Sequence, residues 1–223
     1  MPWEVFDREA TTYEQWYRSK RGERADRSER ALLKWLLTQF PSPRTIVEVG
    51  CGTGHFTAAL ASMGLRVVGL ERAPGMAAEM ARDQKLPVIV GDAHRLPFRE
   101  GAVDIAAFVT TLEFLEKPEV AVSEAARIAR QGVILIVLNR WSLGGLSRRF
   151  GGGSRGHLLR QAKDYSLGSI KALVEKVLGP RIQTMGWTST LFPNGFWRLQ
   201  APLPLGDVIG IAVVVSRGDT RAR

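Results

Sequence analysis

Three closely spaced glycines follow an acidic residue in the stretch VEVGCGTGHFT, which runs from Val47 to Thr57. The glycines are Gly50, Gly52 and Gly54, and the acid is Glu48. Glycine is needed where the backbone adopts a positive φ or approaches a ligand closely. A turn from a strand into a helix also points free backbone N–H groups outward. The stretch therefore predicts a loop that binds a nucleotide-like ligand, although a simple tight turn is the alternative.

The spacing of the glycines helps to choose among nucleotides. A dinucleotide-binding loop reads G-x-G-x-x-G. Gly50 and Gly52 fit that pattern, but His55 occupies the place of the third glycine. The substitution disfavours a pyrophosphate-binding turn, and with it a nicotinamide oxidoreductase. It favours a ligand without phosphates that places an amino-acid tail near the loop.

Two further carboxylates follow short apolar runs downstream. Glu71 ends RVVGLE, and Asp92 follows PVIVG. A carboxylate at the tip of a second strand is suited to accept ribose hydroxyls. We expect Asp92 and its adjacent backbone to recognise an adenine edge. Because open α/β sheets bind ligands at the carboxyl ends of their strands, the three elements together predict an adenosine site.

The elements that position these residues alternate after Pro43. Strands buried on both faces lose polar alternation, and alternating strands and helices imply parallel pairing with right-handed crossovers. We therefore predict an α/β fold with a doubly wound, Rossmann-like, seven-stranded, mostly parallel sheet, an antiparallel last strand and helices on both faces. The expected strands are 45–50, 66–71, 87–92, 102–109, 132–138, 181–192 and 206–216, and the expected helices are 55–64, 74–84, 117–130 and 166–179.

Two segments lie outside this alternation within a single predicted domain, 1–223. Residues 1–43 are densely charged and mainly helical in pattern, with one apolar face formed by Leu33, Leu36, Leu37 and Phe40. Residues 139–166 form a Gly/Arg-rich insertion after the fifth expected strand, which should hang over the active site. Between 139 and 163 it contains six cationic residues and no acid: Arg140, Arg148, Arg149, Arg155, Arg160 and Lys163.

Composition narrows the class of protein. The chain has 223 residues, 45% of them hydrophobic, and a formal net charge of +9. A basic balance favours an anionic partner, but it is also common in arginine-rich proteins at large. The one cysteine, Cys51, excludes an internal disulfide and a cysteine metal cluster, and we expect no metal. No apolar run approaches the about 20 residues of a membrane helix, so we expect a cytoplasmic protein without a membrane span, either a monomer or a homodimer.

The combined motifs resemble the class I S-adenosylmethionine-dependent methyltransferases, in particular the type 11 group that includes quinone-biosynthesis enzymes. The resemblance rests on VEVGCGTGHFT, LERAPGM, GDAHRLPFREGAVD and the stretch VTTLEFLEKPEVAVSEAARIARQGVILIVLN, and it covers residues 43–138 well. YEQWYRSKRG near the start is similar to the lead-in of one bacterial and archaeal subgroup. One departure is Val103, a packing position where the group usually has Phe.

The resemblance implies S-adenosylmethionine as cofactor, S-adenosylhomocysteine as product, and a role for each matching residue. Glu71 would hold the ribose, Thr110 would face the sulfonium, and Tyr13 and Tyr17 would close the site. The loop under the methionine moiety would be formed by Glu48, Gly50, Cys51, Gly52 and Gly54. The adenine would be contacted by Arg72, Met76, Asp92 and Ala93.

Methyl transfer from a sulfonium is an in-line displacement, so the protein mainly aligns the reactants. A general base is needed only for an acceptor that holds its proton at neutral pH. The catalytic residues are therefore unassigned, and His157, Glu113 and Tyr165 are the candidates for a base, with Asp164 beside them. We interpret Cys51 as a packing residue, His55 as the start of a helix and His94 as an exposed loop residue.

The expected acceptor is a small molecule, anionic if the arginines of 139–166 bind it. An RNA or protein methyltransferase is the alternative that the net charge leaves open. Aromatic residues that would stack RNA bases are few in that segment, which disfavours nucleic acid without excluding it. A non-catalytic module that only binds S-adenosylmethionine is a further alternative.

Overall fold

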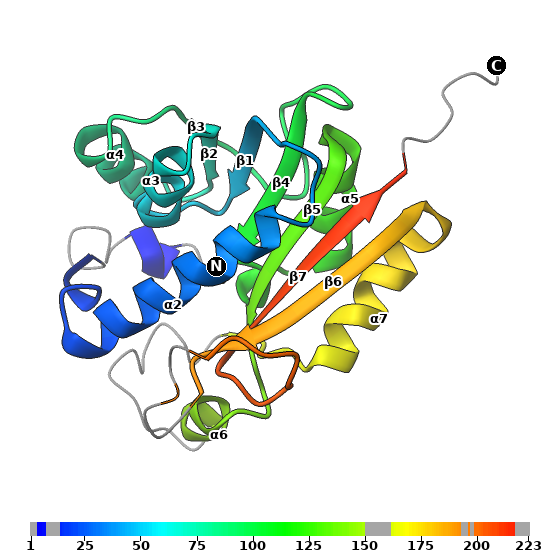
Figure 1. Ribbon diagram of the computed structural model, residues 1–223. Coiled ribbons are helices and arrows are strands. Elements are labelled where there is room, and N and C mark those ends of the chain that lie inside the picture. The colour runs from blue at the N-terminus through cyan, green and yellow to red at the C-terminus, as the bar shows by residue number, and fades with distance from the viewer. Residues whose placement is uncertain (1–3, 8–13, 150–161, 193–195, 197–198, 217–223) are drawn as a thin grey trace.

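The computed structural model describes residues 4–7, 14–149, 162–192, 196 and 199–216, and its centre is one seven-stranded sheet (Figure 1). The strand order is β3-β2-β1-β4-β5-β7-β6. The strands are β1 (Thr45–Val49), β2 (Arg66–Glu71), β3 (Val88–Val90), β4 (Val103–Val109), β5 (Ala129–Leu138), β6 (Ile182–Thr190) and β7 (Val208–Val215).

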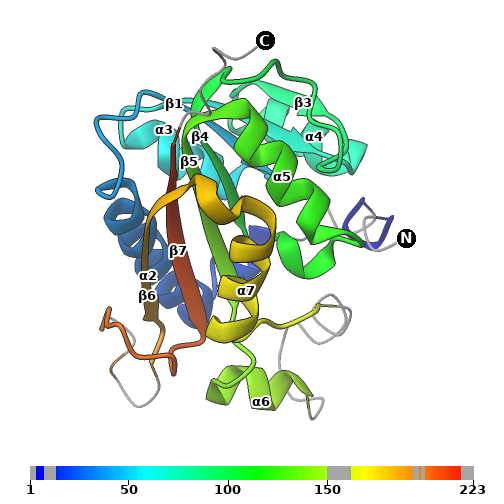
Figure 2. The same ribbon diagram turned by 90° about the vertical axis from the view of Figure 1, so that its right-hand side faces the viewer.

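Helices cover both faces of the sheet, as the sequence predicts (Figure 2). One face carries α2 (Lys20–Leu37), α3 (His55–Ser62) and α4 (Pro74–Asp83), and the other carries α5 (Pro118–Ile128) and α7 (Leu167–Leu178). The remaining elements are α6 (Leu143–Arg149) and the 3-10 turns η1 (Glu14–Trp16), η2 (Leu112–Phe114) and η4 (Gly179–Arg181). No described helix is long and apolar enough to cross a bilayer.

The pairing of the strands confirms the predicted topology. The strands β1 to β5 run parallel to one another, whereas β7 lies antiparallel between β5 and β6. The strands β4, β5 and β7 are almost wholly buried because helices cover both of their faces. This explains why their sequences read as continuous apolar runs without polar alternation.

Most predicted boundaries differ from the structure by a residue or two, and the largest shift is at the start of β5. The helix expected over 117–130 ends at Ile128, and β5 begins at once with Ala129 and Arg130. The chain therefore turns from helix to strand without a loop, which the helix-forming residues of that stretch concealed. In the N-terminal segment η1 and α2 are separate, because the Ser19 side chain caps α2 by accepting from the Gly22 amide at 3.0 Å.

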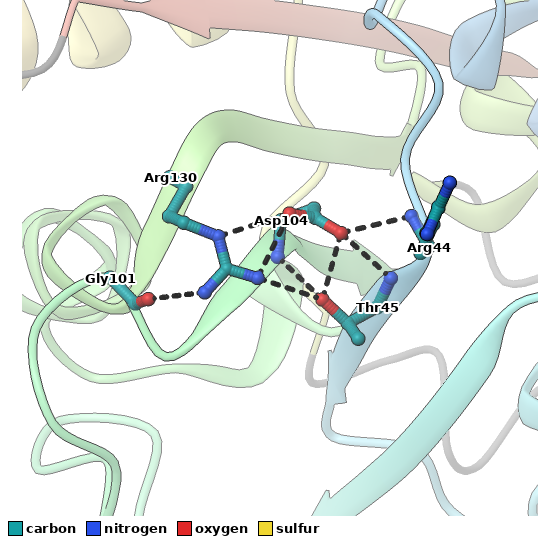
Figure 3. Close-up of polar contacts among 5 residues, drawn as sticks. All are labelled: Arg44, Thr45, Gly101, Asp104 and Arg130. Carbon is teal, nitrogen blue, oxygen red and sulfur yellow. Dashed lines mark hydrogen bonds and ion pairs between the residues drawn. The ribbon is translucent and has the colours of Figure 1, made fainter.

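A polar cluster joins the amino ends of β1 and β4 (Figure 3). Asp104 Oδ2 accepts from the amides of Arg44 and Thr45 and from Thr45 Oγ1, each at 2.9 Å. Asp104 Oδ1 accepts from Arg130 Nη2 at 2.9 Å, and Arg130 Nη1 donates to the Gly101 carbonyl at 2.7 Å. Burial alone would raise the pKa of Asp104, but these donors lower it to about 2. The cluster fixes the end of the sheet opposite the carboxyl ends of its strands.

The first residues of the segment 139–166, from 139 to 144, leave β5 and pack beside the loop that leads into β7. Asn139 Nδ2 donates to the carbonyls of Pro204 and Gly206 at 3.0 and 2.8 Å, and the Gly144 amide donates to Asp207 Oδ1 at 3.0 Å. A short helix, α6, follows, in agreement with the prediction of a partly helical excursion. Residues 150–161, which include Arg155, His157 and Arg160, lie outside the described residues.

Candidate active site

An open cavity lies at the carboxyl ends of β1, β2 and β4, with about 1300 Å³ of empty space including its mouth. Its walls come from the glycine loop, the ends of these strands and residues before α2. Eleven of the twelve predicted cofactor residues line it: Tyr17, Glu48, Gly50, Cys51, Gly52, Glu71, Arg72, Met76, Asp92, Ala93 and Thr110. The twelfth, Gly54, is instead the N-cap of α3.

The glycine loop adopts the conformation that its composition predicts. Gly50 has a φ of 75° and Gly52 a φ of 55°. A Cβ at Gly50 would come within 2.2 Å of Thr111 Cγ2, whereas a Cβ at Gly52 would meet no atom within 4 Å. Gly50 therefore serves the packing of the loop on the end of β4. Gly52 leaves its space to the cavity.

Glu71 ties the tip of β2 to this loop. Its Oε1 accepts from the amides of Arg72 and Ala73, both at 2.8 Å, and its Oε2 accepts from the Gly52 amide at 2.9 Å. Burial raises the pKa of Glu71, and the three amides oppose that shift. Since a carboxylate has about four acceptor positions, Oε2 retains capacity for a further donor from the cavity.

Glu48 lies at the buried floor of the cavity. Its side chain is 2% exposed and accepts a hydrogen bond from Thr57 Oγ1. Burial raises its pKa to about 8, against the effects of Thr57 and of the nearby His55. Glu48 is therefore mainly protonated at neutral pH in the ligand-free protein, and a cationic group brought into the cavity would favour its ionised form.

Asp92 is held by two neighbours on the opposite wall. Its Oδ1 accepts from the His94 amide at 2.9 Å and from His94 Nδ1 at 2.6 Å, and its Oδ2 lies 3.5 Å from Arg72 Nη1. The pKa of Asp92 is lowered, because these hydrogen bonds and charges outweigh its partial burial. His94 is therefore a half-buried residue of the cavity wall, and its interpretation as an exposed loop residue was wrong. Its Nε2 also accepts from the Lys117 amide at 3.3 Å.

The end of β4 carries a backbone irregularity at the cavity. Thr110 has a φ of 49°, which is uncommon for a residue other than glycine. Its amide donates to the Ile136 carbonyl at 2.8 Å, so β5 holds this conformation in place. Residues held in such regions concentrate at functional sites.

Residues before α2 cover part of the cavity, and sequence reasoning missed one of them. Phe6 lines the cavity and meets Phe114 edge to face, with ring centroids 4.9 Å apart. Its neighbour Asp7 accepts from the Gly75 amide at 2.6 Å, at the first turn of α4. No periodic pattern marks Phe6, so only its position in the folded chain reveals it. Tyr13 lies outside the described residues.

Two candidates for a general base, Glu113 and Tyr165, do not line the cavity, and a third, His157, lies outside the described residues. Glu113 is fully buried and does not line the cavity, and its Oε1 accepts from the Leu138 amide at 2.6 Å. Tyr165 is 9% exposed, and its hydroxyl donates to the Leu112 carbonyl at 3.3 Å. Burial and the charge of Glu113 raise the pKa of Tyr165 to about 12. Both side chains fasten η2 to the end of β5.

Comparisons with known proteins agree with this geometry. The model of the methyltransferase domain family Methyltransf_11 matches residues 47–137. A crystal structure from Thermotoga maritima, described as an S-adenosylmethionine-dependent methyltransferase and possible histamine N-methyltransferase, is 28% identical with a TM-score of 0.81. It covers 96% of this chain, which covers 100% of it. Residues 47–137 thus match the type 11 group of methyltransferases, and the chain as described has the class I S-adenosylmethionine-dependent methyltransferase fold.

Two other methyltransferases illustrate the breadth of this similarity. Malonyl-[acyl-carrier protein] O-methyltransferase of Yersinia pestis is 32% identical over 93 residues, which are 41% of this chain and 34% of the relative. Magnesium protoporphyrin IX methyltransferase of Synechocystis, solved with S-adenosylhomocysteine, is 18% identical with a TM-score of 0.63, over 93% of this chain and 95% of that one. The chain spans 20% to 54% of the length of the first curated relatives it matches.

The cofactor of the methyltransferase is S-adenosylmethionine, and the cavity is suited to it. The backbone at Gly52 leaves room for close approach, and Oε2 of Glu71 has capacity for a hydroxyl donor. Buried Glu48 supplies a carboxylate that a cationic amino-acid tail would ionise. Apolar walls from Met76, Ala93 and Leu115 fit a flat base.

Proposed function

We propose that this methyltransferase transfers the methyl group to a small-molecule acceptor whose reacting atom needs no enzymatic base, with a carboxylate oxygen as the first choice. The observation that carries the proposal is the burial of Glu113 and Tyr165 behind the cavity wall. Of the candidates within the described residues, neither lies at the cavity surface. A carboxylate acceptor is already an anion at neutral pH and therefore needs no base.

Within that proposal, the cofactor-binding residues have the following roles. Glu71 holds the ribose through Oε2, and Glu48 with the loop Gly50–Gly52 receives the methionine end. Arg72, Met76, Asp92 and Ala93 surround the adenine, since they line the wall at the ends of β2 and β3. Thr110 lies at the reacting end, where the conformation of β4 brings its backbone to the cavity.

When bound, the cofactor supplies an activated methyl group on a sulfonium. The chain's own contribution is to hold donor and acceptor in line and to keep water away from the reacting atoms. Alignment of this kind contributes about 7–11 kcal/mol to lowering a barrier. Phe6, Phe114 and Tyr17 give the cavity an aromatic wall that excludes water near its mouth.

The proposed class of acceptor is supported by the charge of segment 139–166 and by the proteins that this chain is similar to. Segment 139–166 contributes cations, and arginine binds carboxylates through paired hydrogen bonds. One relative is named as an O-methyltransferase of a malonyl carrier protein, which is consistent with a carboxylate acceptor. An amine is the second candidate, because the structural neighbour is described as a possible histamine N-methyltransferase. An unprotonated amine also needs no base.

In the same proposal residues 1–43 act as a lid. Two carboxylates fasten this segment beside the cavity, Asp7 on the first turn of α4 and Glu14 on the glycine loop. Segment 139–166 forms the acceptor side, since it follows directly on Leu138, another residue of the cavity lining.

The test begins with calorimetric titration of S-adenosylmethionine and S-adenosylhomocysteine into the purified protein, with NAD as control. Micromolar binding of both sulfur ligands and none of NAD is expected. Methyl transfer is then followed with isotopically labelled cofactor on matched panels of small carboxylates and small amines. Turnover confined to amines would overturn the carboxylate proposal, and the absence of cofactor binding would overturn the activity.

A further inference from the structure

His55 connects three elements at the edge of the cavity. It is the first residue of α3 and follows Gly54 at the end of the glycine loop. Its Nδ1 lies 3.3 Å from Glu14 Oε2 in η1, and its Nε2 lies 2.6 Å from Asp26 Oδ1 in α2. The N-terminal elements and the glycine loop are therefore joined through one imidazole ring.

The two contacts define the charge of that ring. Carboxylates only accept hydrogen bonds, so a ring whose two nitrogens each face a carboxylate donates from both and is an imidazolium. Arg30 Nη2 lies 3.4 Å from Nε2, but its guanidinium is held by the same Asp26 oxygen, with Nε at 2.6 Å. Glu14 and Asp26 thus offset the two cations. Their hydrogen bonds and charges raise the pKa of His55 against the opposing effect of burial.

A helix start is an unfavourable place for this cation. The N-terminus of a helix carries partial positive charge, so a protonated side chain there is destabilising. Gly54, at the N-cap of α3, provides no side-chain cap either. The stability of α3 therefore does not explain an imidazolium at this position. The contacts that His55 makes outside α3 do explain it.

The ring also positions a residue of the cavity wall. Tyr17 stacks on His55 with ring centroids 3.7 Å apart and planes within 11°. Tyr17 is 8% exposed and lines the cavity. Glu14, which Tyr17 contacts through a backbone bond of 3.1 Å, also accepts from Thr53 Oγ1 on the glycine loop. One carboxylate and one ring thus set both Tyr17 and the loop.

We infer that His55 is a positioning residue for the cofactor: as an imidazolium between Glu14 and Asp26 it holds the N-terminal segment and Tyr17 against the glycine loop. This inference rests on the proposed roles of Tyr17 and the glycine loop. Its consequence is that cofactor affinity depends on the proton of His55. The link is fully present below the ordinary pKa of histidine and is lost as pH rises through the raised pKa.

The titration of other groups near the ring must be distinguished from the titration of His55. Glu14 is ionised throughout, since its pKa is lowered, whereas Glu48 in the same cavity titrates at about 8. Asp26 and Arg30 keep their partners on α2. The amino group of the ligand titrates too, but identically for every variant. A difference between pH profiles of wild type and variant therefore isolates His55.

The experiment measures the dissociation constant of S-adenosylhomocysteine from about pH 6 to about pH 9 for wild type and His55→Gln. At the lower pH, His55→Gln is expected to weaken binding about tenfold, the effect of losing a hydrogen bond to a charged group. At the higher pH the two proteins should converge. Glu100→Gln is the control, because Glu100 is exposed and lies outside the cavity lining, so its substitution should leave the pH profile unchanged in shape.

Equal affinity and equal pH profiles for wild type and His55→Gln would overturn the inference. Glu14→Gln breaks the same link from the other side, so it tests the inference even if His55→Gln does not fold. The double variant should bind no more weakly than the weaker single variant, whereas additive losses would mean that the two residues act separately. Absence of binding by the wild-type protein would overturn the proposed function itself, and this inference with it.

Discussion

The backbone amide of Gly52 donates to Glu71 Oε2 at 2.9 Å, which joins the glycine loop to the tip of the neighbouring strand. The same oxygen is the part of Glu71 left for a ligand, as the other one already accepts from Arg72 and Ala73. Glu71 is thus both a support of the loop and a candidate ribose ligand. A single substitution should expose both roles.

Glu71→Ala is expected to weaken binding of S-adenosylmethionine by about 1–3 kcal/mol, the range for leaving a hydrogen-bonding site unmade. Calorimetry gives the affinity, and thermal unfolding of the ligand-free protein reports the support of the loop. Glu100→Ala is the control, because Glu100 is exposed and lies outside the cavity lining. Unchanged affinity would refute the ribose assignment.

Alanine at the two loop glycines should have separate effects. Gly52→Ala places its methyl group in open space, so the protein should fold with a loss of about 1–2 kcal/mol for the left-handed backbone. Its cofactor affinity should fall strongly. Gly50→Ala would meet Thr111 and should lose stability by more than Gly52→Ala. Thermal unfolding and calorimetry on both variants check the contrast, which equal stabilities would contradict.

The raised pKa of Glu48 predicts how the ligand-free protein responds to alkali. A group whose folded pKa lies above its unfolded pKa stabilises fully below the unfolded value, and its contribution is lost as pH rises through the folded value, here about 8. Glu48→Gln should therefore be more stable than wild type above this pH, by roughly 2–4 kcal/mol. Chemical unfolding at several pH values measures the difference. The titration of His55 affects stability with the same sign in both proteins, so its contribution cancels in the difference between them.

The lowered pKa of Asp104 predicts that stability depends on pH in the opposite direction, in the acid range. Its folded pKa of about 2 lies below the unfolded value of about 3.9, so its contribution is present above the unfolded value and is lost as pH falls through the folded one. Asp104→Asn should lower the free energy of unfolding at neutral pH by about 2 kcal/mol. Cofactor affinity should stay at the wild-type value, since the cluster joins the amino ends of the strands (Figure 3). A comparable loss of affinity would contradict this separation.

Segment 139–166 allows a test of the acceptor side. Arg148→Gln combined with Arg149→Gln removes two charges from the end of α6. The affinity for S-adenosylmethionine should not change, while KM for an anionic acceptor should rise about tenfold, as expected for lost charge-assisted hydrogen bonds. Steady-state kinetics with the acceptor found in the screen provides the measurement. A collapse of cofactor affinity would instead assign this segment to the cofactor site.

Much of the fold was predictable because its signals are local. The glycine loop, Glu71 and Asp92 each follow a buried strand, and parallel strands bring such positions to one edge of a sheet. The wall formed by Phe6 was not predictable, since it depends on Asp7 reaching the first turn of α4. Nor did the sequence distinguish Glu113 as a buried support from Glu113 as a base, because the burial of a side chain in η2 depends on distant packing.

The position of β7 also bears on how this chain is made. Because β7 lies between β5 and β6, the latter pairs with nothing else in the described sheet until Val208–Val215 has been synthesised. During translation the cofactor half, built on β1 to β4, can assemble while the far edge of the sheet is still open. An open strand edge is a place where chains associate wrongly. Until β7 is in place, β6 therefore remains an unpaired strand of the described sheet and is open to association with other chains.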